Sequence, residues 1–413
     1  MDAGVIGVYV FLFLGLYFEV FLLISFFEKK PAVKTAARPK RYPSVAVIVP
    51  AWNEEKTLAG TIESLLALDY PKNKLEIIVV DDGSTDGTLR AAQRFRKNLQ
   101  VKIFSKENGG KYTALNFGLK HTKSELVGCL DADSFVVPDS LLESVKVFEA
   151  SPEAMAVVPA MKVWKPHRAL ELMQAVEYTF GIFYKKIFDN LAAISVLPGP
   201  FSIYRREVFA IAGPFRPAHQ TEDMEMAFRM HRYRLPIANA HTAVVYTHVP
   251  QTLRKLLKQR TRWSRGFLEN SKDYGYMYFN PRYGYFGLLV LPFSLTMFFG
   301  AMYIMTYLLL RIITSAVGRI QLLSKSQLSP FAFLHPDTWH LSWFYINTDM
   351  LTFLVFITAG ITLFAILAGR RIAGGGFGIG SVIAYFVLYG FIAPLWLARA
   401  TWGMVTARQS SWR

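Results

Sequence analysis

The sequence predicts an α/β fold with a mostly parallel, twisted sheet between helices, joined to about four transmembrane α-helices and to interfacial amphipathic helices. From residue 44 on, short apolar runs alternate with amphipathic segments, and the runs at residues 45–49, 75–80, 101–104 and 126–130 have the length of buried strands. Between the first two runs, Leu58, Ile62 and Leu65 share one face of a predicted helix over residues 54–68. Strands that alternate with helices form parallel sheets, and such sheets bind ligands at the carboxyl ends of their strands.

Further segments extend this pattern. We expect helices over residues 86–97 and 112–120, and less regular strands over residues 156–164, 202–204 and 243–246. The irregular strands indicate a mixed extension of the same sheet rather than a second domain.

Hydrophobic residues make up 52% of the 413-residue chain, which favours a membrane protein. Apolar stretches at residues 5–27, 285–310, 350–368 and 374–397 each approach or exceed the ~20 residues that cross a bilayer. Their only charge is Glu19, which is a candidate functional residue because charges inside a membrane are costly.

The first apolar stretch has two interpretations, a cleaved signal peptide or a retained anchor. It lacks a basic start and a small-residue cleavage site, and its apolar run is too long, so we expect an anchor. Six Lys and Arg residues follow it within residues 29–41, whereas Asp2 is the only charge before it. The positive-inside rule therefore places residue 28 onward in the cytoplasm, in a multi-pass protein of the plasma membrane.

Four segments result from these patterns: an anchor over residues 1–28, a cytoplasmic catalytic domain over residues 44–250, interfacial helices over residues 251–282, and a membrane region over residues 283–413. The interfacial assignment rests on residues 252–270, a strongly basic amphipathic pattern whose charged face suits lipid headgroups.

The formal net charge of +16 raises the question of nucleic-acid binding. The sequence has no basic low-complexity arm and no zinc-ligand spacing, so the lipid bilayer and a phosphorylated substrate explain the charge better than nucleic acid. The single cysteine, Cys129, excludes intrachain disulfides and thiolate metal clusters.

Two acidic motifs directly follow predicted strands. Asp81 and Asp82 come after residue 80, where carboxylates can accept hydrogen bonds from a base or a ribose, although Asp and Gly are also common in turns. Asp131 and Asp133 come after residue 130, and two carboxylates at this spacing can bind one hard cation that also holds a diphosphate. Oxygen-only ligands favour Mg²⁺ or Mn²⁺.

A third acidic motif, Thr221-Glu222-Asp223, opens a helical pattern. One interpretation is helix capping by Thr221, with the acidic residues favoured by the helix dipole. The other makes Asp223 a general base for a sugar hydroxyl. The dipole lowers the basicity of a carboxylate, so this role requires burial or a neighbouring phosphate.

Basic residues supply two further candidates. Gln259, Arg262 and Trp263 share a helix face, which offers an amide, a diphosphate-binding guanidinium and an aromatic plate for a sugar ring. A basic interfacial helix with a tryptophan anchor has the same pattern. Lys111 follows Asn108-Gly109-Gly110 in a loop that suits phosphate, without the spacing of a Walker loop.

The order VIVPAWNEE, VVDDGSTDGT, NGGKYTALNFGL, CLDADS, PGPFSIYRRE, TEDMEMAFRM and QRTRW resembles the family 2 glycosyltransferases over residues 45–263. It is most similar to processive members that make cellulose, chitin-like and poly-N-acetylglucosamine chains. The resemblance implies a GT-A fold, a UDP-sugar donor and inversion at the anomeric carbon. Hyaluronan synthases usually carry Gly-Asp-Asp where this chain has Thr-Glu-Asp, so hyaluronan is disfavoured.

The resemblance also implies residue roles. The nucleotide-sugar site would comprise Ala51, Glu54, Asp81, Asp82, Lys111, Asp131, Gln259 and Arg262. Asp133 and Asp131 would hold the metal, Asp223 with Glu222 would carry the catalysis, and the acceptor would meet Gly199, Pro200, Phe201 and Trp263.

Two products fit this resemblance: a β-linked polysaccharide such as one built from UDP-GlcNAc or UDP-glucose, coupled to export, or a single sugar added to a lipid acceptor. The joint presence of TED and QRTRW favours the polymer. A transporter is disfavoured because four spans without repeats are too few, and an inactive relative because every motif carboxylate is present. Four spans form a thin channel, so export would require a second copy or a small accessory membrane subunit.

Overall fold

The computed structural model describes residues 3–28, 38–326, 350–375 and 377–406. These residues form two compact units. The sheet unit comprises Leu23–Pro292 and Ala365–Arg413, and the helical unit comprises Met1–Leu22 and Phe293–Phe364.

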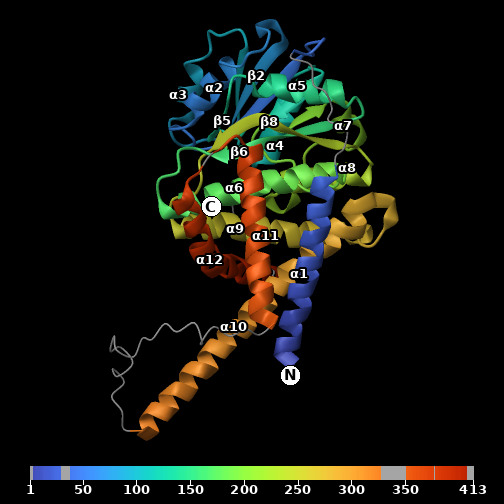
Figure 1. The fold of residues 1–413 in the computed structure, drawn as a ribbon. Coiled ribbons are helices and arrows are strands. Elements are labelled where there is room, and N and C mark those ends of the chain that lie inside the picture. Colours follow the sequence, from blue (N-terminus) through green and yellow to red (C-terminus); the bar gives the residue numbers. More distant parts are fainter. Residues whose placement is uncertain (1–2, 29–37, 327–349, 376, 407–413) are drawn as a thin grey trace. The chain divides into compact units, whose positions relative to one another are not determined.

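The sheet unit is built on eight strands in the order β3-β2-β1-β4-β7-β6-β8-β5 (Figure 1). Strand β1 pairs in parallel with β2 and β4, β2 with β3, and β6 with β8, whereas β7 pairs antiparallel with β4 and β6, and β5 with β8. The parallel half and its mixed extension were both predicted. The strands are β1 Val45–Ala51, β2 Leu75–Asp82, β3 Val101–Lys106, β4 Leu126–Cys129, β5 Ser134–Val136, β6 Ala156–Val163, β7 Ile203–Arg205 and β8 Ile237–Thr247.

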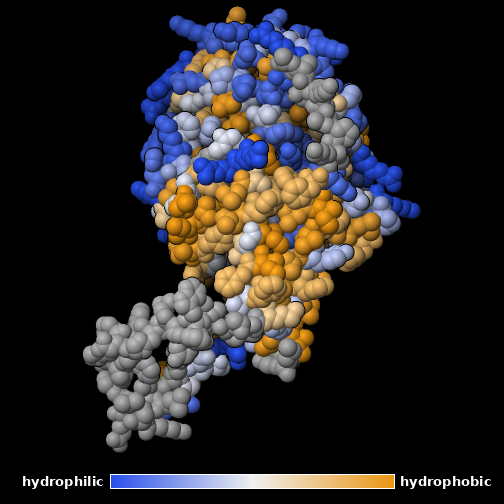
Figure 2. All heavy atoms as spheres, viewed as in Figure 1, coloured by the Kyte–Doolittle hydropathy of each residue, from blue (hydrophilic) through white to orange (hydrophobic). Residues whose placement is uncertain are grey.

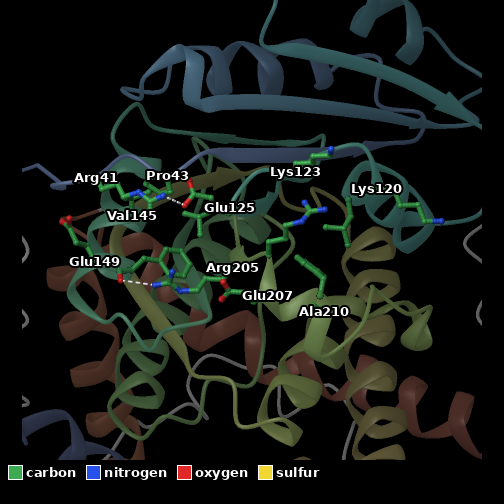
Figure 3. A pocket seen from close by; sticks show the side chains of 15 residues that line it. Arg41, Pro43, Lys120, Lys123, Glu125, Val145, Glu149, Arg205, Glu207 and Ala210 are labelled. Carbon is green, nitrogen blue, oxygen red and sulfur yellow. Dashed lines mark hydrogen bonds and ion pairs between the residues drawn. The ribbon is translucent and has the colours of Figure 1, made fainter.

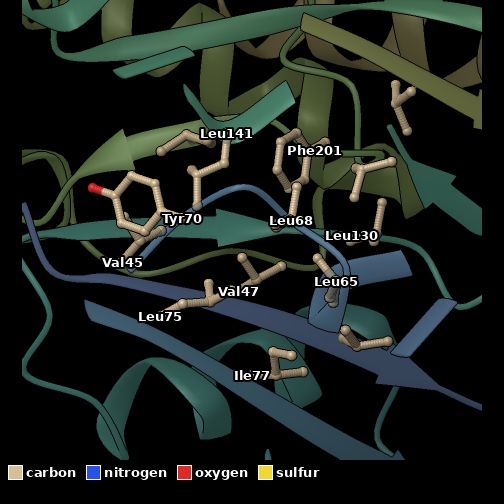
Figure 4. Packing of buried hydrophobic residues seen from close by; sticks show 14 of the residues in the cluster. Val45, Val47, Leu65, Leu68, Tyr70, Leu75, Ile77, Leu130, Leu141 and Phe201 are labelled. Carbon is tan, nitrogen blue, oxygen red and sulfur yellow. The ribbon is translucent and has the colours of Figure 1, made fainter. Parts of the chain in front are cut away.

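Helices cover both faces of the sheet. One face packs against α2 Leu58–Leu66, α3 Thr88–Gln93 and α5 Ser140–Ala150, and the other against α4 Lys111–Lys120, α7 Glu207–Ile211 and α8 Glu222–Arg232. Figure 4 shows Val47, Leu65, Ile77 and Leu141 in the first of these cores, where all four are fully buried. Each such side chain contributes about 1.5–3 kcal/mol by leaving water.

A further group of helices lies below the sheet in Figure 1: α6 Ala169–Asn190, α9 Leu253–Asp273 and α12 Ile379–Val405. They share an apolar cluster that includes Met173, Val176, Leu256, Tyr385 and Trp396. Hydrophobic side chains gather on this side of the unit in Figure 2, whereas the sheet side is largely hydrophilic.

Several elements differ from the sequence predictions. The helix expected from residue 54 begins at Leu58, the strand expected over residues 243–246 is the longer β8, and β5, α5, α6 and α7 were not predicted at all. Strand β5 has only three residues, and α6 mixes charged with apolar positions. Short single-turn elements occupy Lys72–Lys74, Ala218–Gln220, Gly275–Met277, Pro281–Tyr283 and Phe286–Val290.

The helical unit contains α1 Ala3–Phe27 up to Leu22, most of α10 Leu291–Ser326 and the first part of α11 Met350–Ile372. Phe18 stacks on Phe293 at 3.6 Å between ring centroids, and the Tyr303 hydroxyl donates to the Gly4 carbonyl at 3.1 Å. Glu19 is half-buried. By length and composition, four helices of the described residues could cross a membrane: Gly4–Phe27, Phe286–Gly318, Met350–Ile372 and Ile379–Met404.

Candidate active site at the carboxyl edge of the sheet

The carboxyl ends of β1, β2 and β4 meet at one edge of the sheet. Ala51 at the end of β1 lies in register with Asp81 at the end of β2, and Asp131 follows β4. The first residues of α4 and α8, Lys111 and Glu222, reach the same edge. The sequence motifs therefore converge, because parallel strands and the helices that follow them place their polar ends together.

Lys111 is the cation at the centre of this edge. Its Nζ lies 2.6 Å from Asp131 Oδ1 and 3.3 Å from Glu222 Oε1. Burial alone would lower the pKa of Lys111, but Asp131, Glu222 and Asp223 more than offset burial and raise that pKa. The lysine is therefore positively charged at neutral pH.

Asp223 has the environment of a base. Burial raises its pKa, and the neighbouring Glu222 raises it further, while Lys111, Arg262 and the hydrogen bond from Met224 oppose them. The Met224 N–H donates to Asp223 Oδ1 at 2.9 Å, which orients the carboxylate at the first turn of α8. Burial thus offsets the effect of the helix dipole, as the proposed role requires.

The turn that precedes α8 is strained. Ala218, His219 and Gln220 have φ angles of 41°, 53° and 65°, in the left-handed region that non-glycine residues rarely adopt. The Gln220 carbonyl accepts a hydrogen bond from Arg262 Nη1 at 2.5 Å, so α9 helps to hold this turn. Strain of this kind concentrates at functional sites.

Thr221 is the N-cap residue of α8 and acidic residues follow it, as the capping interpretation expects, but its side chain makes no capping hydrogen bond. Its hydroxyl donates to the Ala218 carbonyl at 3.0 Å and accepts from Asn270 Nδ2 at 2.9 Å. Gly266 of α9 leaves room for it, since a Cβ at Gly266 would overlap Thr221. Thr221 therefore joins the start of α8 to α9.

The carboxylates of Asp131, Asp133 and Glu54 repel one another. Burial, then Asp131 and Glu54, raise the pKa of Asp133 to about 7, and Ser134 Oγ donates to Asp133 Oδ1 at 3.0 Å. Among the described residues, no group of three His, Cys, Asp or Glu side chains is arranged to hold a metal. The donor set fits a hard cation that takes further ligands from a diphosphate and water.

Asp81 and Asp82 are buried and bonded within the chain. Asp81 accepts from Ser105 Oγ at 2.8 Å. Asp82 accepts from Lys106 Nζ at 2.6 Å and from the Gly109 and Gly110 amides at 3.1 and 2.8 Å. Asp82 thereby shapes the loop that leads to Lys111, which the sequence motif alone did not indicate.

In the Gly199-Pro200-Phe201 motif, Gly199 lies at the candidate site, whereas the Phe201 side chain lies in the hydrophobic core. Gly199 lies against Lys111 and Asp131. The Phe201 side chain is fully buried in the core of the sheet, as Figure 4 shows, so only its backbone can face a ligand. The Phe201 N–H donates to the Cys129 carbonyl at 2.6 Å, which ties the motif to β4.

Gly199→Ala should reduce sugar transfer about 100-fold while the protein still folds. A Cβ at this position would lie 2.5 Å from Lys111 Nζ and 2.9 Å from both Asp131 carboxylate oxygens, so those flexible groups must move. A displacement near 1 Å in a catalytic site costs about this much. The measurement compares initial rates and thermal unfolding with Gly60→Ala, whose Cβ meets nothing within 4 Å. Equal rates for the two variants would contradict close packing at Gly199.

Of the residues predicted on α9, Arg262 acts on Asp223, and α9 also contributes a residue that was not predicted. Arg260, which the sequence did not single out, lies 2.8 Å from Glu177 of α6 and places its guanidinium 4.3 Å from the centre of the Trp263 ring. Gln259 is half-buried, and its Oε1 has no hydrogen-bond partner. The Arg260 guanidinium therefore holds the Trp263 ring in position, and the side-chain oxygen of Gln259 can still accept a hydrogen bond.

Lys185 of α6 is a second residue that the sequence did not indicate. Burial lowers its pKa to about 8, and Asp223 acts in the opposite direction. Neither Lys185 nor Arg260 has a signal in the sequence, because each acquires its neighbours only when α6 packs under the site.

A cavity of about 950 Å³ lies elsewhere, near the amino-terminal ends of β1 and β4 (Figure 3). Arg41 pairs with Glu125 there at 2.6 Å, and Lys120, Lys123 and Arg205 also line it. None of the predicted site residues contributes to this cavity. The candidate active site is therefore at the carboxyl edge of the sheet, where a small cavity is lined by Lys111, Gly199, Glu222 and Asp223.

Comparison with known proteins agrees with this geometry. Residues 46–211 match the model of glycosyl transferase family 2. This part of the chain is a family 2 glycosyltransferase domain. It contains β1 to β4, Lys111, both strand-end acidic motifs and Gly199.

The chain is similar in sequence to two staphylococcal enzymes. The chain is 30% identical over 261 residues to poly-β-1,6-N-acetyl-D-glucosamine synthase of Staphylococcus epidermidis and 28% identical over 260 residues to that of Staphylococcus aureus. Each match covers 62% of this chain and 63% of the relative, so the chain spans just under two thirds of their length.

A solved structure confirms the GT-A fold. Mannosyltransferase PcManGT from Pyrobaculum calidifontis, in complex with GDP-Man and Mn²⁺, matches with a TM-score of 0.64 at 18% identity, over 98% of both chains.

Proposed function

We propose that this protein is a membrane-embedded inverting glycosyltransferase of the plasma membrane. Its cytoplasmic domain would transfer sugar from a UDP-sugar, UDP-GlcNAc or UDP-glucose, to the end of a growing β-linked polysaccharide. The family match, the names of the relatives and the four candidate spans support this proposal. The observation that carries it is the arrangement at the start of α8: Lys111 is paired with Asp131 and Glu222, and the half-buried Asp223 next to Glu222 has a raised pKa that suits a base.

In the proposed mechanism, Asp223 takes the proton of the acceptor hydroxyl as its oxygen attacks the anomeric carbon from the face opposite the nucleotide. Lys111 and Arg262 stabilise the charge that develops on the departing diphosphate. Trp263 would hold the acceptor sugar, Gln259 would face the diphosphate, and Asp81 and Glu54 would bind the nucleotide.

Asp133 and Asp131 would hold Mg²⁺ or Mn²⁺, which would neutralise the diphosphate as a Lewis acid. The PcManGT structure contains Mn²⁺. Here Asp133 already requires compensation for its burial beside two carboxylates, and a divalent cation would supply it.

A donor screen tests the proposal. Purified protein in lipid should release UDP from UDP-GlcNAc or UDP-glucose with Mg²⁺ or Mn²⁺, and yield a product that grows in length with time. A product of one sugar on a lipid would support the alternative of glycolipid synthesis. The unfolding temperatures of wild-type protein and its Asp223→Asn variant are compared as a folding control. If the two are equal and the wild-type protein transfers sugar from no nucleotide sugar, the glycosyltransferase proposal is refuted.

A further inference from the structure

Helix α12 packs on the sheet unit along its length rather than at one end. Tyr385 near its start contacts Phe180 of α6 at 6.4 Å between ring centroids, and Tyr389 lies beside Glu177 and Arg260. Near its end, a Cβ at Gly403 would lie 3.7 Å from Arg265 of α9. Residues 385 and 403 are about 27 Å apart at 1.5 Å per residue. The contact therefore extends over nearly the thickness of a bilayer core.

Helices α6 and α9 cannot occupy the hydrocarbon core. Helix α9 carries nine charged residues between Arg254 and Asp273, and α6 carries five between Glu171 and Asp189. A charge at the centre of a bilayer costs several kcal/mol. Helix α6 is also fixed to the sheet domain, where Gln174 Nε2 donates to the Pro250 carbonyl at 2.9 Å. Both helices thus stay at or above the membrane surface.

A helix that crossed the bilayer could touch α6 and α9 only through its first turns. Helix α12 instead keeps Ser381, Tyr385, Ile392, Trp396 and Ala400 buried, a set that repeats along one face. Since its partners remain at the interface, α12 must remain at that depth too.

The opposite face of α12 is mostly apolar and exposed. Exposed apolar side chains on it include Ile383, Val387, Phe391, Leu395 and Trp402, and the one charge among them is Arg399, near the end of the helix, whose long side chain can reach the lipid headgroups. Phe391 is 79% and Trp402 is 68% exposed. Helices with one side held at the surface and an apolar side turned to the acyl chains lie in the plane of the interface.

Charges in the sequence support the same placement. Arg370 and Arg371 precede α12, Arg399 lies in its last two turns and Arg408 follows it in the sequence, with no Asp or Glu after Asp349. Lys and Arg are enriched on the cytoplasmic side of membrane helices, so the positive-inside rule assigns both ends of α12 to the cytoplasmic side. A helix that crosses once would place its two flanks on opposite sides.

We propose that α12 is a monotopic helix, which lies in the cytoplasmic face of the bilayer with its exposed stripe among the lipid acyl chains. Although α12 is long and apolar enough to span, the chain then crosses with the other three candidate helices. Residue 406 lies on the same side as the catalytic domain. This inference does not depend on which sugar is transferred.

Substituted cysteines test this placement, since Cys129 is buried and burial raises its pKa to about 12, which leaves wild-type protein unlabelled. Thr406→Cys at the exposed end of α12 is compared with Leu99→Cys in the sheet domain and Met350→Cys at the start of α11. A membrane-impermeant maleimide is applied to intact cells and to inside-out vesicles, and labelling in SDS gives the total for each variant.

We expect T406C and L99C to label only in inside-out vesicles and M350C only in intact cells. Labelling of T406C from the side opposite L99C would overturn the proposal. So would protection of T406C from both sides with full labelling in SDS, since residue 406 would then lie within the hydrocarbon. Thermal unfolding and UDP release of each variant verify that the labelled protein is folded.

Discussion

Asp223→Asn should reduce sugar transfer by about 100- to 10,000-fold, the contribution typical of a general base. Asparagine keeps the shape and accepts the Met224 N–H through its amide oxygen, but it cannot take up the proton of an acceptor hydroxyl. The buried carboxylate also disappears from beside Glu222, so the fold should not be destabilised. The measurements are the rate of UDP release, UDP affinity by titration, and thermal unfolding.

UDP binding should change little, because the loss belongs to the chemical step rather than to the nucleotide. Asp139→Asn is the matched control, since Asp139 is exposed at the start of α5 and makes no side-chain capping bond there. Wild-type rates in the Asp223 variant would contradict its role as the base. A loss of UDP binding equal to the loss of rate would instead place Asp223 in nucleotide recognition.

The sheet and its acidic edge were predictable because their signals are local. An apolar run followed at once by carboxylates, as at Val80-Asp81 and Leu130-Asp131, specifies both the strand and the place where its side chains emerge. Parallel pairing then brings such ends together whatever the order of the strands. Lys111, at the start of the helix that follows β3, lies at this edge beside Asp131.

The contacts beneath the site could not be predicted, because they join segments that are distant in the chain. Arg260 meets Glu177 across 83 positions, and Thr221 meets Asn270 across 49. The Thr-Glu-Asp motif has the pattern of a helix cap, yet packing against α9 redirects the Thr221 hydroxyl. Local propensity was overridden by tertiary contacts, as is common where a site requires a particular geometry.

With α12 in the interface, as proposed, composition alone gives an incomplete account of the membrane helices. Helix α12 has the length and hydropathy of a span, and these properties cannot distinguish a helix surrounded by lipid from one that packs on an amphipathic partner. The distinction lies in which face is buried and against what, and that information exists only in the folded unit.

Lys111→Met should destabilise the protein by about 3 kcal/mol at neutral pH and abolish most sugar transfer. Methionine fills the same volume but leaves Asp131 and Glu222 without the cation that lies within 3.3 Å of both. The remaining carboxylates would repel the diphosphate that the site is proposed to bind. The measurements are thermal unfolding in detergent, UDP affinity and the rate of UDP release.

The pH dependence of this destabilisation separates charge from packing. Asp131, Glu222 and Asp223 raise the pKa of Lys111, so its stabilising contribution is present at neutral pH and is lost only as the pH rises through that raised value. Below neutral pH, Asp223 takes up a proton because its pKa is raised, so the negative charge around Lys111 falls in wild-type protein too and the difference in stability should shrink. Lys123→Met, at an exposed lysine outside this site, should show no such difference at any pH. A Lys111→Met penalty that is constant from acidic to neutral pH would mean that Lys111 acts through its packing, because only the charge of its partners varies over that range.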